Sequence, residues 1–388
     1  MSEGNHEFRF TAAEFSRIRE LIFQRAGIKL SSPDRVTRLA AVATLRDSTN
    51  PKIRELLRSR LAGHDETDPE IRNAMILALR NIESVLAVSE YAGLVFTGIS
   101  LGSILLLAAL GLAITYGLMG VINMAHGEMI MIGAYATFLA QNLFRAHFPE
   151  YFQWYLAAAV PAAFLVTALV GMAIERLVLR FLYGRSLETL LATWGLSLFL
   201  MQLVRSLFGA QNVQVENPAW MSGNVALTAT LLLPYNRIVI IVFAVAVLGL
   251  VSWLLTKTRL GLFVRAVTQN RAMARCVGVN TGRVDTLAFG LGSGIAGLAG
   301  VALSQIGNVG PDLGQHYIVD SFMVVVLGGV GQLAGAVYAA MGLGVASKLL
   351  ENFSGAVLAE IALLVFIIIF IQKRPQGLFA LSGRSAES

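Results

Sequence analysis

Apolar residues dominate the chain beyond about residue 90, in long runs separated by short polar stretches. A helix needs roughly 20 predominantly apolar residues to cross the hydrocarbon core of a bilayer. Eight runs reach that length. The pattern predicts an all-α polytopic membrane protein over residues 91–380, with hydrophobic segments near 92–116, 119–142, 154–179, 189–208, 235–256, 284–306, 320–348 and 355–372.

Residues 1–90 are charge-dense and predict a soluble helical region. Asn50 and Asp68 each stand before a proline and a run of apolar residues at helical spacing, so both are expected to be N-caps. The two stretches repeat after 18 residues, which leaves open a small HEAT-like piece and a generic helical bundle. Val36, Leu39 and Ala43 indicate a preceding helix.

Charge predicts the orientation of the membrane region. The formal net charge is +6, and the loop 257–283 holds six basic residues and no acid. The positive-inside rule places this loop, the 180–188 loop and Lys373 in the cytoplasm, so the excess indicates orientation in a membrane and not nucleic-acid binding. The nearly uncharged loop 209–234 is expected outside. An even number of crossings must then separate 283 from 373, so 320–348 crosses twice or dips in and returns.

The location of residue 1 depends on two observations. The opening residues Met1-Ser-Glu-Gly-Asn-His-Glu lack the basic region and apolar stretch of a secretory signal peptide, which favours the cytoplasm. The location of residue 1 also depends on how the segment 119–142 enters the membrane. If the segment crosses once, residue 1 lies outside, and if it re-enters, residue 1 lies inside.

Two of the apolar segments are interrupted by glycines. One interruption lies within Gly117–Gly133, and the other, Leu327–Gly335, holds four glycines. Such broken segments in corresponding positions of two halves indicate a transport site. The alternative is that the glycines only permit close packing of helices, as we expect for Gly290 and Gly294.

Asn123, His126 and Glu128 lie in the first of these interruptions. Ionisable groups at membrane depth cost about 3 kcal/mol each on insertion scales and usually face a cavity or the protein interior. We therefore expect part of this segment to be irregular, polar and functional. A purely structural role is the alternative, in which His126 and Glu128 bond the free backbone groups of a broken helix or pair with Arg176.

Several kinds of chemistry lack their motif. No Gly-x4-Gly-Lys-Ser/Thr phosphate loop occurs, so the chain is not expected to hydrolyse ATP itself. Cys276 is the single cysteine, which excludes a disulfide within the chain. No His-Glu-x-x-His pattern occurs, and we expect neither a metal site nor a cofactor.

The stretch from Gly117 to Glu128 resembles the signature of the branched-chain amino acid family of ABC-importer permeases. The resemblance covers about 90–380, because further motifs follow in the same order: Ile174-Glu-Arg, Thr193-Trp-Gly, Arg265-Ala-Val-Thr-Gln-Asn270, Leu327-Gly-Gly-Val-Gly and Arg374-Pro-Gln-Gly-Leu-Phe. Within this family the chain looks most like the urea-type permease, which has a similar N-terminal extension. The resemblance implies a bacterial inner-membrane subunit that works with a homologous second permease, two ATP-binding subunits and an extracytoplasmic substrate-binding protein, in contact with membrane lipid.

Two sets of residues follow from this resemblance. Urea is neutral and rich in hydrogen-bonding groups, so amide, hydroxyl and carboxylate side chains are expected to pass it along the path without trapping it. The expected path residues are Asn123, His126, Glu128, Thr193, Gln202 and Gln332. The basic loop is expected to form one short helix over 265–278 that docks the ATPase, with Arg265, Asn270, Arg271, Ala274, Arg275 and Gly278 as its key positions. The alternative is a basic loop that only contacts anionic lipid headgroups.

Other readings stay open at this point. Branched-chain amino acids and short amides are alternative substrates on the same scaffold. A membrane-embedded enzyme that uses His126 and Glu128 is an alternative of another class, and a carrier that needs no ATP is a third. Asp312, His316 and Asp320 are expected in an outer loop, where they either receive the binding protein or are simply solvated.

Overall fold

The computed structural model describes residues 21–379 except 24, 49, 64–65, 121 and 227–230. These residues form two compact units. The first comprises described residues up to Leu94 and those of the segment Asn224–Leu233, and the second comprises Val95–Gly223 and the residues from Pro234 onward. The fold is all-α apart from one short two-stranded sheet among the described residues, β1 (Asn224–Ala226) paired with β2 (Leu232–Pro234).

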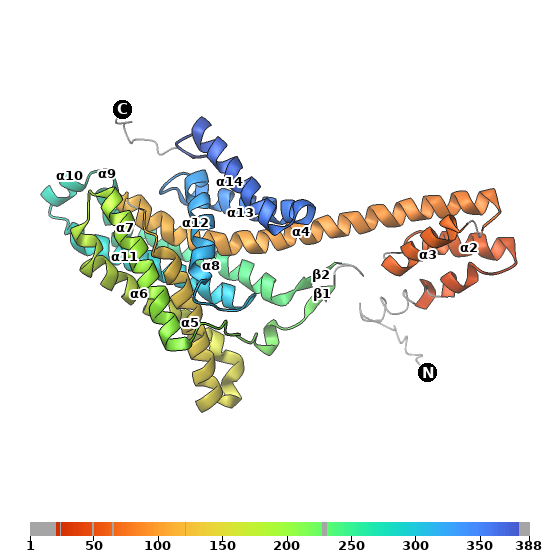
Figure 1. Ribbon diagram of the computed structural model, residues 1–388, viewed down its shortest axis with the longest axis horizontal. Helices are drawn as coiled ribbons and strands as arrows, with labels where there is room; N and C mark the ends of the chain where they lie inside the picture. The colour runs from red at the N-terminus through yellow and green to blue at the C-terminus, as the bar shows by residue number, and fades with distance from the viewer. Residues whose placement is uncertain are drawn as a thin grey trace, which may run out of the picture. The chain divides into compact units, whose positions relative to one another are not determined.

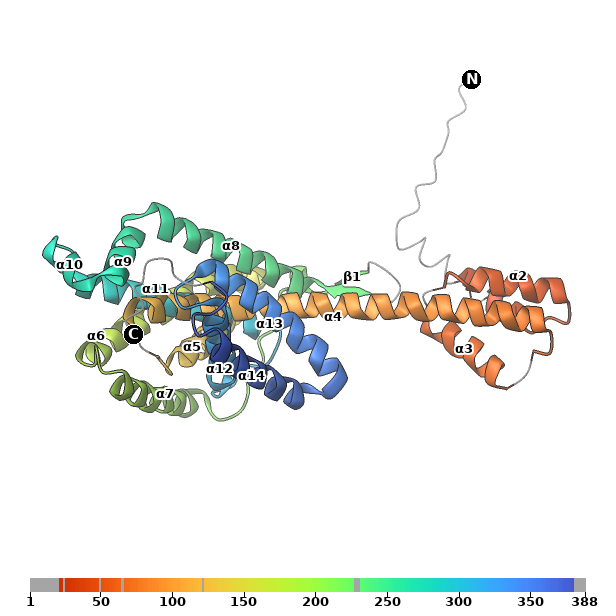
Figure 2. The ribbon, with the colours of Figure 1, turned by 90° about the horizontal axis from the view of Figure 1, so that it is seen from above.

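The first unit is a small helical bundle. Helices α2 (Arg35–Leu45) and α3 (Pro51–Ala62) pack beside the start of α4 (Pro69–Met119) (Figure 2). Both predicted caps are confirmed: Asn50 accepts a hydrogen bond from the amide of residue 52, and Asp68 accepts one from the amide of residue 70. The preceding helix is confirmed as α2, on which Val36 and Ala43 are exposed. Its buried face is made instead by Ala41, Val42 and Leu45.

The second unit contains the membrane-spanning region. Seven helical segments of the described chain are long and apolar enough to cross a membrane, and α12 is a shorter apolar helix. The polytopic all-α prediction is confirmed. In order along the chain, the remaining helices are α5 (His126–His147), η1 (Pro149–Trp154), α6 (Tyr155–Leu177), η2 (Leu179–Phe181), α7 (Ser186–Phe208), η3 (Ala219–Met221), α8 (Tyr235–Lys257), α9 (Arg259–Gln269), α10 (Arg271–Cys276), α11 (Thr281–Ser304), α12 (Leu313–Gly328), α13 (Leu333–Ser354) and α14 (Ala356–Lys373).

Helix α11 is the centre of the second unit and packs against both α5 and α6 (Figure 1). Glycines make these contacts close. A Cβ at Gly133 would collide with the backbone of Gly297, and one at Gly300 would collide with the backbone of Ile130. Gly290 and Gly294 face Met172 and Phe164 of α6, so the close packing expected for this pair is confirmed.

The chain is interrupted at both predicted places. Helix α4 ends at Met119, Gly120 takes a φ of 66°, and α5 begins only at His126. Between α12 and α13 the chain turns through Gly329–Gln332, where Gly329 and Gly331 have φ values of 98° and 77°. The two interruptions meet, because Gly331 lies within 3.0 Å of the Cβ position of Gly117.

The C-terminal motif is attached to the second interruption. The amide of Leu378 donates a hydrogen bond of 2.8 Å to the carbonyl of Leu327, near the end of α12. Gly377 lies against Gly329, with its Cβ position 2.7 Å from the Gly329 Cα. This contact supplies a partner for one of the carbonyls that the end of a helix leaves free.

Two contacts join the loops to the helices. Met119 and Asn123 lie beside Tyr183 of the 180–188 loop, around one small cavity. The indole of Trp220, in the 209–234 loop, donates a 3.0 Å hydrogen bond to the carbonyl of Gln153, which lies between α5 and α6. Helices α12 and α13 pack against each other on either side of the turn Gly329–Gln332. The orientation of the loops and the even number of crossings between 283 and 373 stay predictions.

The glycine contact between α5 and α11 yields a stability prediction. Gly133→Val should lower the free energy of unfolding by at least about 1–3 kcal/mol, because overpacking forces the two backbones apart. Gly195→Val, where a Cβ meets nothing within 4 Å, is the matched control. Thermal unfolding of the purified chain in detergent measures both. Equal midpoints for the two variants would contradict the assigned contact.

Candidate functional site

His126 and Glu128 lie in the first turn of α5, fully buried. The prediction that they are part of the irregular segment is wrong, because that segment ends at Ala125. His126 Nε2 lies 3.0 Å from the carbonyl of Ala108 in α4, and Ser197 of α7 donates a 2.8 Å hydrogen bond to Glu128 Oε1. Neither side chain pairs with Arg176. His126 Nδ1 and Glu128 Oε2 are buried and have no hydrogen-bond partner among the described residues.

Asn123 and Thr193 hold the irregular segment itself. The Asn123 side chain accepts a 3.0 Å hydrogen bond from the amide of Ala125. The Thr193 hydroxyl accepts a 3.2 Å bond from the amide of Met124 and donates one of 3.0 Å to the carbonyl of Leu190. The adjoining cavity measures only about 10 Å³, which is room for a single water. Any path at this point is therefore closed in this conformation.

The other two expected path residues do not join this cluster. The buried face of α7 carries Thr193 and Ser197, and Gln202 lies off that face and is exposed. Gln332 is half-buried in the turn before α13, and its backbone N–H donates a hydrogen bond to the carbonyl of Gly329. The structure thus brings Asn123, His126, Glu128 and Thr193 together and places Gln202 and Gln332 elsewhere.

The basic loop forms two helices, α9 and α10, so the prediction of one helix over 265–278 is wrong (Figure 1). Asn270 separates them, because its extended backbone ends α9 and its side chain caps α10 by accepting a 2.9 Å hydrogen bond from the amide of Met273. Gly278 ends α10 with a φ of 88°, as expected. Arg265 is exposed and contacts only the carbonyl of Gly261 among the described residues.

Helix α10 is clamped to the membrane helices by a buried polar network. Arg271 is hydrogen-bonded to the fully buried carboxylate of Asp285 in α11. Its guanidinium lies 5.0 Å from the centre of the Tyr183 ring. Tyr183 in turn donates a 2.6 Å hydrogen bond to Glu175 of α6, and Thr286 donates another of 2.6 Å to the same carboxylate.

The charge states of this network follow from its surroundings. Burial, and then the hydrogen bond to Glu175, raise the pKa of Tyr183 above its ordinary value, so the phenol remains a donor at physiological pH. Arg176 donates a 2.9 Å bond to Thr286, and Arg275 donates one of 3.0 Å to Thr281. A displacement of α10 is therefore passed to α6 and α11 through directional, charge-assisted bonds.

Of the expected docking positions, Ala274 is buried against the protein, and Arg265, Asn270, Arg275 and Gly278 are exposed. Two apolar side chains that the sequence analysis did not name, Met273 and Val277, are 61% and 71% exposed. They are four residues apart, at the spacing of one helix face, and offer an apolar surface to a partner. This spacing within a basic segment is the sequence signal by which they could have been found.

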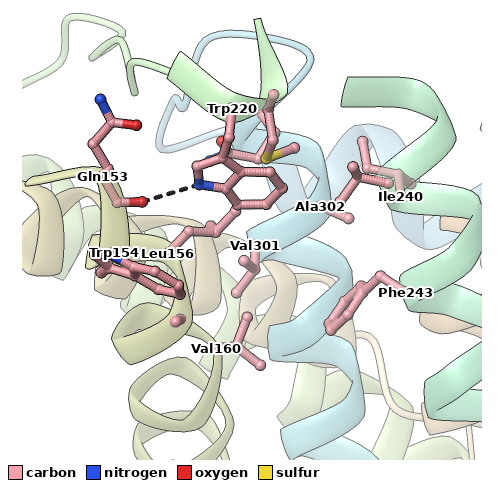
Figure 3. A pocket seen from close by; sticks show the side chains of 13 residues that line it. Gln153, Trp154, Leu156, Val160, Trp220, Ile240, Phe243, Val301 and Ala302 are labelled. Atoms are coloured by element: carbon pink, nitrogen blue, oxygen red, sulfur yellow. Dashed lines mark hydrogen bonds between the residues drawn. The ribbon is translucent and has the colours of Figure 1, made fainter. Parts of the chain in front are cut away.

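A separate cavity of about 310 Å³ opens among α6, α8 and α11 (Figure 3). Trp154, Val160, Phe243 and Val301 line it with carbon atoms. Trp220 closes one end through its bond to the carbonyl of Gln153. A surface of this kind suits an acyl chain and offers little to orient a polar solute. Among the described residues no group of three or more His, Cys, Asp or Glu is placed to hold a metal ion.

Comparison with known proteins adds independent information. Residues 94–372 match the family model described as "Branched-chain amino acid transport system / permease component". The chain is 29% identical to the high-affinity branched-chain amino acid transport system permease protein BraD of Pseudomonas aeruginosa, over 74% of this chain and 95% of BraD. It is 30% identical to LivH, the corresponding permease protein of Salmonella typhimurium, over 73% of this chain and 93% of LivH. No solved structure matches.

The network predicts a large effect for one arginine. Arg271→Met should lower the free energy of unfolding by about 3–5 kcal/mol, because it leaves the Asp285 carboxylate buried without its cation. Arg185→Met breaks the exposed 3.0 Å pair with Glu188 and should cost only about 0–1 kcal/mol. Thermal unfolding in detergent compares them. The double variant Arg271→Met/Asp285→Leu should recover part of the loss, and no recovery would argue against the pair.

A second prediction concerns the bond between α5 and α7. In a double-mutant cycle, Glu128→Met and Ser197→Ala should show a coupling energy of about 0.6–1.7 kcal/mol, the range measured for hydrogen bonds between membrane helices. Glu128→Gln keeps an acceptor oxygen and serves as the control that retains the coupling. Unfolding in mixed detergent micelles supplies the four stabilities. Strict additivity would mean that the two side chains do not bond.

Proposed function

Because the chain belongs to the permease family of branched-chain amino acid transport systems, we propose that it forms half of the solute path of an importer for branched-chain amino acids or short amides. The matching region is the membrane unit, and the chain is a multi-pass protein of the cytoplasmic membrane. The observation that carries the proposal is the ion pair between Arg271 of α10 and Asp285 of α11. Through this ion pair a partner that moves α10 would also move α11.

The proposed partners follow from the surfaces that the chain offers. An ATP-binding subunit would receive α10 through the exposed side chains of Met273 and Val277, in the basic loop that the positive-inside rule assigns to the cytoplasm. The expected docking residues Asn270, Arg271 and Ala274 then have a different part: they cap, clamp and pack the helix from within. A second, homologous permease and an extracytoplasmic substrate-binding protein complete the assembly that the family implies.

The proposed mechanism is a rigid-body movement. Closure of two ATP-binding subunits would displace α10, and the Arg271–Asp285 bond would pass that displacement to α11. Helix α11 touches α5 through glycine backbones, so α5 cannot stay in place when α11 moves. The first turn of α5 adjoins the closed point at Asn123, and its shift would open the path there.

The expectation of urea as the substrate lacks support from the comparisons. BraD and LivH are named for branched-chain amino acids, and the autoinducer 2 import system permease LsrC of Salmonella paratyphi B is 37% identical over 24% of this chain and 28% of its own length. The names of BraD and LivH favour branched-chain amino acids among the alternative substrates. Selection is expected to rest mainly with the binding protein.

The experiment that tests the proposal is ATP-dependent uptake by the assembled complex in proteoliposomes. Labelled L-leucine and isobutyramide should enter only with ATP and the cognate binding protein, and labelled urea should enter slowly or not at all. Uptake of leucine by this chain alone, without ATPase subunits, would contradict an importer subunit.

A docking variant supplies the second arm of this experiment. Met273→Glu should lower the amount of ATPase that co-purifies with the chain by about tenfold or more, since a buried charge replaces an apolar contact. Leu187→Glu, which alters another exposed apolar side chain, 76% exposed and outside α10, should leave co-purification unchanged. If both variants retain the ATPase, α10 is not the docking surface.

A further inference from the structure

The apolar cavity among α6, α8 and α11 lies within three of the candidate membrane spans (Figure 3). Each helix lines it near one of its ends: Val160 is the sixth residue of α6, Phe243 is the ninth of α8, and Val301 is the fourth from the end of α11. At the 1.5 Å rise of an α-helix, the lining reaches about 12 Å into these helices. Because the ends of spanning helices lie near the surface of the bilayer, the cavity is at the depth where acyl chains leave their headgroups.

The polar groups beside this cavity already bond one another. The carbonyl of Gln153 accepts the hydrogen bond of the Trp220 indole. The side chain of Gln305 accepts a 3.3 Å bond from the hydroxyl of Tyr155 and donates one of 3.1 Å to the hydroxyl of Ser304. A buried water needs two to four polar partners, so water and polar solutes find little to hold them here. An empty space would cost the lining atoms their dispersion contacts, which an aliphatic chain restores.

A cation stands at the surface end of the cavity. Arg237 precedes the lining residue Ile240 by three positions, on the same face of α8. Helical side chains lean toward the N-terminus, so its guanidinium lies on the surface side of Ile240. Arg237 is half-buried, and its guanidinium has no ion pair and no hydrogen bond with the described residues. Trp154 and Trp220, 68% and 51% exposed beside the cavity, are of the type that favours the headgroup level.

We propose that this cavity binds one acyl chain of an anionic phospholipid whose phosphate group is held by Arg237. The acyl chain lies against Val160, Phe243 and Val301, and the planar guanidinium suits a phosphate through two parallel hydrogen bonds. No acidic side chain lines the cavity, so the ammonium group of a zwitterionic headgroup finds no partner there.

This lipid site is distinct from the proposed solute path. No residue that lines it also lines the small cavity at Asn123. Its contact with Val301 makes the acyl chain a packing partner of α11, the helix at the centre of the membrane unit.

Photo-crosslinking of the full-length chain in detergent micelles tests this assignment. The probe is phosphatidylglycerol that carries a diazirine in one acyl chain, and the labelled peptides are identified by mass spectrometry. Labelling should concentrate in the parts of α6, α8 and α11 that line the cavity. Unlabelled phosphatidylglycerol should suppress it at a concentration about tenfold lower than unlabelled phosphatidylethanolamine, the effect of one charge-assisted hydrogen bond.

Three variants separate the cavity from the surrounding lipid. Ala157 and Ala158 are neighbouring exposed alanines of α6, and only Ala157 lines the cavity. Ala157→Trp fills the space and should abolish labelling of the cavity peptides, whereas the matched control Ala158→Trp should label as the wild type does. Arg237→Gln should keep the labelling and make the two competing lipids equally effective.

Three results would overturn the proposal. Equal labelling of Ala157→Trp and Ala158→Trp would show that the lipid does not occupy the cavity. Labelling of α7 and α14 as strong as that of the cavity peptides would show only the lipid that surrounds any membrane protein. Equal suppression by both unlabelled lipids in the wild type would remove the anionic headgroup. If thermal unfolding shows that Ala157→Trp is misfolded, Val160→Phe, three residues further along α6, fills the same cavity and repeats the measurement.

Discussion

Close approach of helix backbones is the constraint on which the membrane unit depends. Lipid offers no hydrophobic gain for bringing helices together, so association relies on dispersion, polar bonds and small residues. Helix α11 meets α5 and α6 through glycines whose missing Cβ atoms leave space for a neighbouring backbone or ring. At such distances one helix cannot slide without its neighbours, and this rigidity lets a cytoplasmic movement reach the middle of the bilayer.

The polar side chains around these packed helices form hydrogen bonds to backbone groups that the helix ends leave free. Asn123 and Thr193 make hydrogen bonds to the backbone of the interruption before α5, and His126, at the start of α5, lies 3.0 Å from the carbonyl of Ala108. Irregular backbone is tolerated at this depth only when it is buried in protein in this way. These polar groups therefore hold the interruption in place.

The amino-acid pattern predicted the elements far better than their contacts. Hydropathy and glycine content were sufficient for the polytopic all-α class and for the two glycine interruptions, because both depend on local composition. The predicted number of eight segments differs from the seven candidate spans of the described chain, and the segment 320–348 is two helices, α12 and α13. Side-chain roles failed where tertiary partners decide them. His126 seemed part of an irregular polar stretch, yet α4 and α7 surround it as the start of a helix. Asn270 was expected inside a single helix and instead separates α9 from α10. Its side chain caps α10, and this cap outweighs the helical propensity of the neighbouring residues.

The prediction of His316 and Asp320 in an outer loop is wrong for a related reason. Both residues lie within α12. They stand next to an apolar run, and nothing local distinguishes the last residues of a loop from the first turns of a helix.

The attachment of Leu378 to Leu327 has a consequence for biogenesis. Helix α12 is synthesised well before Leu378, whose backbone amide donates the hydrogen bond to the carbonyl of Leu327. Helices α13 and α14 lie between the two residues in the sequence. Until Gly377 and Leu378 emerge from the ribosome, the carbonyl of Leu327 lacks this hydrogen-bond donor, and Gly329 lacks its contact with Gly377. The second interruption therefore matures late in translation, while the α4–α5 interruption already has its partners in α4 and α7. Both halves of the second unit contain a glycine interruption, and the interruption after α12 completes its contacts later in synthesis than the one before α5.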